Sequence, residues 1–435
     1  MEEVPEISGG AERLARLPDP LAASAARIAT SLRRAGHQAW IVGGAVRDLL
    51  LDRVPVDVDL VTDALPDEVA ALFDRTVTVG ISFGVVIVLD GVVQIEVATF
   101  REERGYSDRR RPDEIRYAAD PVVDARRRDF TCNALFLDPL DGRLLDPTGG
   151  AKDLEDGLLR TVGDPADRFR EDGLRLLRMA RFSASLGLEP APGLLEAATA
   201  ETSSIDGVSA ERVLDELLKI VRCDPATRNA RRSLELLQLC GIAERCLPGW
   251  PGGVEGEARV RLAGALEAAA PAAEPEVLLA AMLPEDPAGA DAALRALRAS
   301  NELRESVRAI VVAESAVVEA ASAQLDALDE EEVGGLVELW RSGSARNAAL
   351  LREARMGLAE PAAANALRTG WARVGERAGL APDSPIDLSA ADLMDLGVER
   401  GPALGAGLRR VRLASLGGAF HDRSGALAWA RAALR

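Results

Sequence analysis

The pattern of apolar residues changes abruptly near Asp153, and this change constrains the fold more than any other feature of the sequence. Before it, short β-branched runs alternate with helix-like pieces, and Asp90-Gly91 between two such runs is typical of a β-hairpin. After it, leucine and alanine recur at helical spacing to the C-terminus, interrupted by Pro/Gly stretches such as 248–253. The sequence therefore predicts an α+β fold, in which a head with a mixed sheet precedes an all-helical neck, body and tail.

The head is expected to begin with a helix over 11–36 and to contain short strands with little chain between them. The short connections leave no room for the crossover helices of a long parallel sheet. The predicted strands cover residues 38–42, 56–61, 77–79, 84–89, 92–98 and 134–138, with helical pieces over 45–51 and 66–73. A chain of 435 residues is too long for one core, so we expect a head over 1–148, a neck over 149–225, and a body and tail over 226–435.

Composition excludes several classes of protein. Only 3% of the residues are aromatic, which indicates aliphatic, helix-rich cores. The four cysteines have no CxxC spacing and the chain has two histidines, which argues against a zinc site or a disulfide framework. No run approaches 18 apolar residues, and the first ten residues lack signal-peptide character. We therefore expect a cytoplasmic protein with no membrane contact.

The net charge of −18 is unusual for a protein that handles nucleic acid. The basic residues, however, are almost all arginines, which suit bidentate contacts to phosphate. Many of them fall in one stretch, namely Arg101, Arg104, Arg109, Arg110, Arg111, Arg116, Arg126, Arg127 and Arg128. A local basic patch is thus compatible with phosphate binding on an acidic protein.

Two acidic residues with one residue between them, Asp57 and Asp59, are the first candidate site. If residues 56–61 form a strand, both carboxylates share one face while Val56, Val58 and Leu60 face the core. Paired carboxylates repel each other unless cations lie between them, and the spacing suits two Mg²⁺ ions. Glu96, in an apolar strand, is a candidate third ligand, although an exposed edge strand and a solvated glutamate are the simpler alternatives.

A strand followed by two glycines and a helix lies upstream, at Ile41 to Asp48. Glycines let backbone N–H groups approach a phosphate closely, and a helix N-terminus favours an anion. Arg47 can reach the same phosphate. Many tight turns have this pattern, but its place thirteen residues before the acidic pair predicts a triphosphate site beside a metal site.

These motifs resemble, in order, those of the class II tRNA nucleotidyltransferase and bacterial poly(A) polymerase family. The resemblance covers about residues 41–219 and is carried by Val42 to Asp48, Asp57-Val58-Asp59, Arg127 to Ala134, Asp146-Pro147, Gly149-Gly150, Glu171-Asp172 with Arg175, Arg178 and Arg181-Phe182, and Glu211-Arg212 with Glu216 and Lys219. A weaker similar segment lies over 392–405, and residues 225–380 match in helical character alone.

The resemblance implies a role for each matched residue. Asp57 and Asp59, with Glu96, would hold two Mg²⁺ ions. Contacts to the nucleotide would come from Gly43, Gly44, Arg47, Arg128, Asp129 and Asn133. Asp172, Arg175, Arg178 and Arg181 are spaced by three, which predicts one face of a helix. In this family the pair at the positions of Asp172 and Arg175 selects the base as a template of protein side chains.

The activity that the resemblance implies is addition of CCA, or its terminal A, to the 3′ end of tRNA. The 3′-hydroxyl would attack the α-phosphate of CTP or ATP in line, with pyrophosphate as the leaving group. The partners would be tRNA, ATP and CTP, and no protein partner is implied. Residues 80–86 resemble the tRNA-type pattern rather than the basic segment of poly(A) polymerases, and the loop over 101–116 is one that CC-only enzymes lack.

Several alternatives stay open at this level. Within the family they are a poly(A) polymerase and an enzyme that adds A alone. Outside it, the chain could be an RNA-binding relative without catalysis, or a small-molecule adenylyltransferase. The last of these would lack the ladder from Asp172 to Arg181 and the long helical body.

Overall fold

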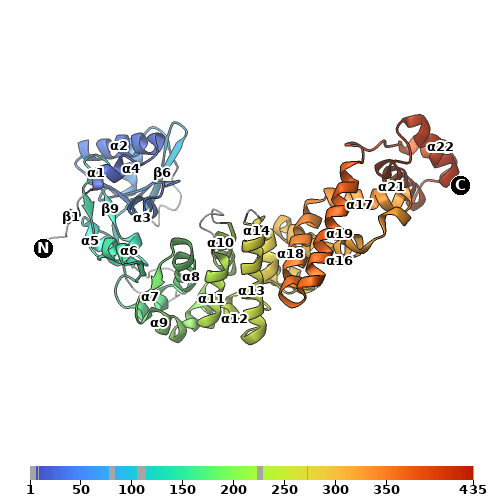
Figure 1. Cartoon of the computed structure of the whole chain (residues 1–435). Coiled ribbons are helices and arrows are strands. Elements are labelled where there is room, and N and C mark those ends of the chain that lie inside the picture. Colours follow the sequence, from blue (N-terminus) through green and yellow to red (C-terminus); the bar gives the residue numbers. More distant parts are fainter. Residues whose placement is uncertain are drawn as a thin grey trace. The chain divides into compact units, whose positions relative to one another are not determined.

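The computed structural model describes residues 6–7, 9–77, 84–104, 114–222, 229–271 and 273–434. They form two compact units, one of Met1–Ile220 with Arg232–Cys246 and one of Val221–Arg231 with Leu247–Arg435. The first holds the sheet and the helices that follow it, and the second is helical (Figure 1). The predicted α+β class is confirmed. The three-part division at residues 148 and 225 stays a prediction.

A sheet of eight strands, in the order β1-β10-β9-β2-β3-β6-β5-β4, organises the first unit. In the described chain its strands pair antiparallel except for β3 and β6, which run parallel. The predicted mixed sheet is therefore confirmed. Its strands are β1 (Glu6–Ile7), β2 (Ala39–Val42), β3 (Asp59–Thr62), β4 (Thr76–Val77), β5 (Val85–Asp90), β6 (Val93–Thr99), β9 (Phe136–Leu137) and β10 (Leu144–Leu145).

Two smaller ribbons complete the strands. The predicted loop over 101–116 is wrong at its ends, because β7 (Arg101–Arg104) pairs antiparallel with β8 (Glu114–Tyr117). Residues 105–113 between them, with the arginines predicted there, lie outside the described residues. In the helical region, β11 (Leu158–Leu159) pairs in parallel with β12 (Glu189–Pro190).

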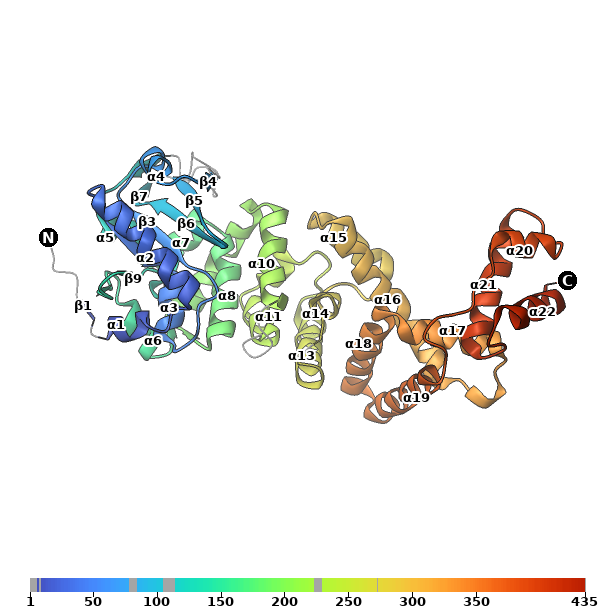
Figure 2. The same cartoon turned by 90° about the horizontal axis from the view of Figure 1, so that it is seen from above.

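The helices of the first unit surround this sheet and continue from it (Figure 2). α2 packs on β2 and β6 through a buried stripe of small and aliphatic side chains, and α4 packs beside it on β5. The bounds are α1 (Gly10–Leu14), α2 (Asp19–Arg34), α3 (Gly44–Leu50), α4 (Pro66–Leu72), α5 (Pro121–Arg126), α6 (Gly150–Glu155), α7 (Pro165–Glu171), α8 (Leu174–Leu186), α9 (Leu194–Ala200), α10 (Ala210–Arg222), α11 (Ala230–Leu239) and α12 (Ala243–Cys246), with 3₁₀ turns at Thr131–Asn133 and Thr202–Gly207.

The single helix predicted over 11–36 is wrong. The structure has two helices, which end at Leu14 and begin again at Asp19. Pro18 and Pro20 explain the break, because proline has no backbone N–H and disfavours helical geometry in the residue before it. Pro20 instead lies in the first turn of α2, where a missing N–H costs nothing.

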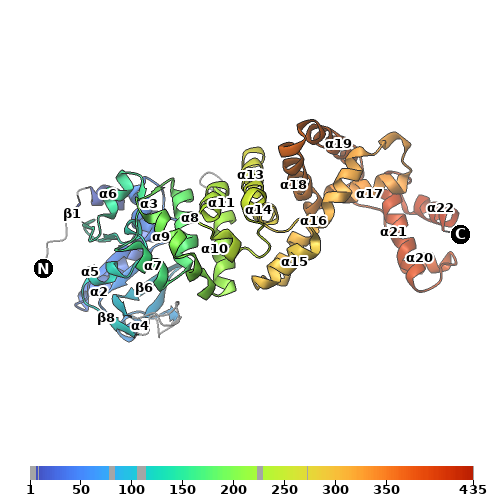
Figure 3. The same cartoon turned by 90° about the horizontal axis from the view of Figure 1, so that it is seen from below.

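The second unit is built from helices that pack against one another (Figure 3). Its longest helix, α16, is preceded by Ser300, whose hydroxyl accepts a hydrogen bond from the Leu303 N–H and so caps the helix. The bounds are α13 (Gly253–Ala269), α14 (Pro275–Met282), α15 (Pro287–Ala296), α16 (Asn301–Ser322), α17 (Glu330–Arg341), α18 (Gly343–Ala359), α19 (Pro361–Gly379), α20 (Ala390–Asp395), α21 (Pro402–Gly417) and α22 (Arg423–Ala433), with a 3₁₀ turn at Leu325–Ala327. No helix in the described part of the chain is long and apolar enough to cross a bilayer.

Candidate active site

The two glycines lie where the chain turns from β2 into α3. Gly43 has φ 73°, a conformation that side chains with a Cβ rarely adopt, so glycine is required here. α3 begins at Gly44. Val42, the residue before the turn, pairs with Asp59 on β3, and the double-glycine turn therefore lies directly beside the acidic residue.

The strand that carries the acidic pair is shorter than predicted. β3 begins at Asp59, so Asp57 precedes the strand, and Val56 is 89% exposed instead of facing the core. The prediction for Val56 was wrong, while Val58 and Leu60 are buried as expected. Pro55 explains the difference, because its missing N–H keeps the incoming chain from joining the ladder.

Glu96 lies next to Asp59 across the parallel pair of β3 and β6. Residues in register on adjacent strands point to the same face, about 5 Å apart. Along β6, Ile95 and Val97 are buried while Glu96 is exposed, so its carboxylate lies on the face opposite the core side chains. The tertiary structure thus brings Asp59 and Glu96 together from positions 37 residues apart.

The electrostatics of Asp59 reflect this crowding. Desolvation, followed by the carboxylates of Glu96 and Asp57, raises the pKa of Asp59 to about 6, against a smaller opposing effect of Arg128. A carboxyl group that is costly to ionise among other carboxylates is a suitable ligand for a cation, since the cation offsets the repulsion. The donor set, three carboxylates without a thiol or an imidazole, matches the preference of Mg²⁺ for oxygen ligands. Among the described residues, no group of three acidic, histidine or cysteine side chains is placed so that it could hold a metal ion, and the metal site at these three carboxylates stays a prediction.

A chain of hydrogen bonds joins the glycine turn to the helical neck. The Arg47 guanidinium donates to Asn133 Oδ1 at 2.8 Å, and Asn133 Nδ2 donates to Asp129 Oδ1 at 3.1 Å. Asp129 Oδ2 accepts from Arg178 Nε on α8 at 2.8 Å. Although burial opposes ionisation, Arg178 and these hydrogen bonds lower the pKa of Asp129 to about 2. Residues predicted from two separate motifs, Arg47 from one and Asp129 and Asn133 from the other, therefore form one connected network with Arg178.

Arg128 has a buried partner that the sequence analysis missed. Its guanidinium donates to Asp124 Oδ2 at 2.7 and 3.1 Å, and Arg127 donates to Asp124 Oδ1 at 2.7 Å. Asp124 is fully buried, and although burial acts in the opposite direction, Arg128 and Arg127 hold its pKa below the ordinary value. An aspartate four residues before an arginine, at helical spacing, was the available signal.

The predicted ladder from Asp172 to Arg181 is wrong at its first member. α7 ends at Glu171 and α8 begins at Leu174, so Asp172 lies in the break between them. A Cβ on Gly173 would lie 2.1 Å from the Ser204 carbonyl oxygen, so only glycine permits this close approach. The other three members, Arg175, Arg178 and Arg181, share α8.

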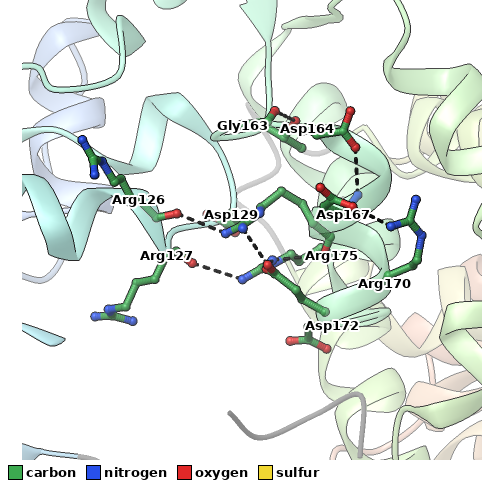
Figure 4. Close-up of polar contacts among 12 residues, drawn as sticks. Arg126, Arg127, Asp129, Gly163, Asp164, Asp167, Arg170, Asp172 and Arg175 are labelled. Atoms are coloured by element: carbon green, nitrogen blue, oxygen red, sulfur yellow. Dashed lines mark hydrogen bonds and ion pairs between the residues drawn. The ribbon is translucent and has the colours of Figure 1, made fainter. Parts of the chain in front are cut away.

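Asp172 and Arg175 contact different partners. Arg212 on α10 donates to both carboxylate oxygens of Asp172, at 3.1 and 2.7 Å. Arg175 donates to Glu171 and, at 3.1 Å, to the carbonyl oxygen of Arg127 (Figure 4). Arg175 therefore links the neck to the head, and Arg212 is a partner of Asp172 that the sequence did not reveal.

Phe182, to which the sequence analysis gave no role, lies among three arginines. Its ring centroid is 5.3 Å from the guanidinium carbon of Arg47, 5.0 Å from that of Arg178 and 4.1 Å from that of Arg181. Arg181 also donates to the buried carboxylate of Glu216. A guanidinium is held by the negative face of an aromatic ring, so this one ring positions side chains from both the head and the neck.

Part of the predicted site lies outside the described residues. This holds for residues 80–83 of the tRNA-type segment and for residues 105–113 of the loop. The described residues nevertheless assemble a double-glycine turn, a carboxylate cluster and an arginine-rich neck helix on one compact unit.

Models of two protein domains match the sequence. Residues 39–160 match the poly(A) polymerase head domain. Residues 187–251 match a domain described as the probable RNA and SrmB-binding site of polymerase A. The first match contains the glycine turn, the acidic pair and the Arg128 segment.

Curated relatives match the N-terminal half. The CCA-adding enzyme of Bacillus subtilis is 45% identical over 219 residues, which are 50% of this chain and 54% of that protein. The CCA-adding enzyme of Bacillus pumilus is 42% identical over 222 residues, 51% of this chain and 54% of that protein. The chain thus spans about half the length of the curated relatives it matches.

Solved structures match over nearly the whole chain. The CCA-adding enzyme of Bacillus stearothermophilus in complex with CTP has a TM-score of 0.73 and 29% identity, over 94% of this chain and 96% of that one. The Thermotoga maritima CCA-adding enzyme complexed with tRNA shares the fold, with a TM-score of 0.69 and 18% identity over 100% of both chains. Over the residues that the domain models and the curated relatives match, the head and neck of this chain are therefore similar to the class II tRNA nucleotidyltransferase and bacterial poly(A) polymerase family.

Proposed function

We propose that this chain is a template-independent RNA nucleotidyltransferase that adds CCA, or its terminal A, to the 3′ end of tRNA. The substrates are CTP and ATP, and pyrophosphate is released. One observation supports this assignment above the others: the double-glycine turn, Asp59 and Glu96 lie side by side on the central strands β2, β3 and β6 of the sheet. A triphosphate held by the turn then lies next to the carboxylates.

The triphosphate is held by the head. Backbone N–H groups at Gly43 and Gly44 approach its oxygens, and Arg47 adds charge-assisted hydrogen bonds. Arg128 supplies further positive charge beside Asp59. Asp129 and Asn133 orient Arg47 and contribute contacts to the ribose. Each of these roles is compatible with the network that joins Arg47, Asn133 and Asp129.

In this proposal Asp57, Asp59 and Glu96 would hold two Mg²⁺ ions, which would supply charge stabilisation to the transferred phosphate. The residues of the chain align the reactants, so that the RNA 3′-hydroxyl faces the α-phosphate and attacks it in line.

Base selection belongs to the neck. Asp172 offers acceptors and Arg175 donors to the Watson–Crick edge of the incoming base, and Arg178 and Arg181 extend this surface along α8. Arg212 orients the Asp172 carboxylate through its two hydrogen bonds. We assign catalysis to residues 1–148, base and RNA binding to 149–225, and tRNA binding to 226–435, and we place the protein in the cytoplasm, where its substrates are found.

Poly(A) polymerase activity is the second candidate, because the head domain model that matches residues 39–160 carries that name. The third is an RNA-binding relative without catalysis. The resemblance of the CCA-adding enzymes over the head and the neck favours the first candidate.

Product analysis with labelled CTP and ATP distinguishes these candidates. Three RNAs are compared, namely tRNA that ends at the discriminator base, tRNA that ends in CC, and an unstructured oligonucleotide. Addition of three nucleotides to the first RNA, or of one A to the second, is the expected result. A long A ladder on the oligonucleotide would instead assign poly(A) polymerase activity.

The control is Asp59→Asn, which removes one carboxylate at nearly constant volume. It should abolish nucleotide addition on all three RNAs while RNA binding is retained. Wild-type protein that adds no nucleotide to any of them would favour the non-catalytic relative.

A further inference from the structure

A pocket of about 520 Å³ lies in the second unit, between α13 and the end of α18. Its volume is that of a small-molecule site. Three arginines line it, Arg259 and Arg261 from α13 and Arg355 from α18, together with Glu255 and Glu285. Leu262 and Leu358 form an apolar part of the wall.

Arg355 is held at this wall without full use of its donors. Its side chain is 10% exposed, and its Nη1 atom lies 3.3 Å from Glu285 and 3.4 Å from Glu314. Within the described ranges, its Nε and Nη2 atoms are buried and have no hydrogen-bond partner. Such unused buried donors are costly, and they leave the charge of Arg355 incompletely compensated by hydrogen bonds.

Glu314 offsets the charge of the Arg355 guanidinium only in part. It is 6% exposed, and neither of its carboxylate oxygens accepts a hydrogen bond from the described residues. Burial raises the pKa of Glu314, and Arg355 and Arg352 oppose this effect. The three arginines of the wall thus have Glu255 and Glu285 in the same lining, with Glu314 next to Arg355.

The two arginines of α13 differ in how they are held. Arg259 donates to the Met282 carbonyl oxygen at 3.0 Å, and its guanidinium lies 5.8 Å from the Trp250 ring centroid, so it is fixed in place. Arg261 is 55% exposed, and its acidic neighbour Glu257 is 3.8 Å away. Arg261 is thus free to close on a ligand.

We propose that this pocket binds the phosphate group of a nucleotide, either free or within an RNA strand. The three guanidinium groups can donate charge-assisted hydrogen bonds to phosphate oxygens. Glu255 and Glu285 would repel bare phosphate, but they accept hydrogen bonds from ribose hydroxyls and base amines. The apolar wall at Leu262 and Leu358 fits the ribose or the base. For an RNA strand the proposal rests on the proposed function, because the pocket lies within residues 226–435, to which we assign tRNA binding, and it needs no residue of the head.

Hydrogen–deuterium exchange of the full chain tests the proposal locally. AMP, an RNA octanucleotide and inorganic phosphate are titrated separately, and protection is followed in peptides covering α13 and α18. We expect AMP or the octanucleotide to protect both helices, and inorganic phosphate to protect them much less. Protection by AMP assigns a free nucleotide, and protection by the octanucleotide alone assigns an RNA strand.

Arg261→Gln is the first variant, because the side chain is exposed and its loss leaves the fold intact. About tenfold more ligand should be needed to reach the same protection, which is the effect expected from the loss of one charged hydrogen bond. Arg295→Gln is the matched control, since Arg295 is 65% exposed on α15 and does not line the pocket. Arg355→Gln should abolish the protection.

Three results would overturn the proposal. They are the absence of protection at α13 and α18, equal protection in wild type and Arg261→Gln, and protection by inorganic phosphate as strong as that by AMP. Each is distinguishable from failure of the proposed activity, which is read from nucleotide addition to RNA. If Arg355→Gln does not fold, Arg261→Gln alone decides.

Discussion

Replacing Asp59 with Asn should stabilise the metal-free protein while abolishing activity. Asp59 ionises reluctantly in the folded state, where its pKa is about 6 rather than 3.8. Each unit of pKa difference between the folded and unfolded states corresponds to about 1.4 kcal/mol. The difference of about 2.2 units for Asp59 therefore lowers the free energy of unfolding above pH 6 by at most about 3 kcal/mol. Since Asp59 is an exposed residue, solvent screening reduces this to about 1 kcal/mol.

The sign of the pH dependence follows from the raised pKa. The folded state binds the proton more tightly than the unfolded state, so the wild type loses stability as the pH rises from 3.8 to about 6. The advantage of Asp59→Asn should therefore be full at pH 7.5 and shrink toward zero below pH 4.

Urea denaturation with EDTA at pH 7.5, 5 and 4 measures this difference. Asp74→Asn, at an exposed carboxylate of the same unit, is the matched control and should leave the free energy of unfolding unchanged. Adding Mg²⁺ should stabilise the wild type more than Asp59→Asn, because a ligand of the folded state adds to its stability. The reasoning is refuted if Asp59→Asn is no more stable than wild type at pH 7.5, or if its advantage persists at pH 4.

Three further substitutions test the neck and its contacts with the head. Asp129→Asn leaves Arg178 without its buried partner and should destabilise the protein by about 3 kcal/mol; a melting temperature within 2 °C of wild type would contradict this. Phe182→Leu removes the ring beneath three guanidinium groups and should raise the KM for ATP about tenfold with a smaller change in kcat. Phe182→Tyr keeps an aromatic ring and should have the KM of the wild type. Equal KM values for all three proteins would show that the ring does not position the arginines for ATP binding. Gly173→Ala places a Cβ against a carbonyl oxygen and should lower the free energy of unfolding, measured by urea denaturation, by more than about 2 kcal/mol. The control Gly335→Ala, in open space within α17, should instead raise it by about 0.5–1 kcal/mol. An unchanged stability of Gly173→Ala would show that the backbone relaxes and would contradict the prediction.

The described head shows where local sequence is a sufficient guide. Runs of β-branched residues predicted β5 and β6, and Asp90-Gly91 predicted the turn between them, because these signals act over a few residues. Prolines were the main source of error. Pro18 and Pro20 split the first helix, and Pro55 delayed the start of β3, because the effect of a proline depends on which neighbouring N–H would have been used.

For the site, sequence by itself determined which residue types stand near each other along the chain. It determined the double glycine before a helix, the acidic pair and the arginines spaced by three, since each is a local pattern with a physical reason. Partners distant in sequence are a different matter. Only the tertiary structure decided that Asp59 lies beside Glu96, that the Asp172 carboxylate pairs with Arg212 rather than with the Arg175 guanidinium, and that Phe182 lies among three guanidinium groups. Strand register and the packing of the neck on the head set these contacts, and both depend on how the whole apolar surface is buried, which no short segment encodes.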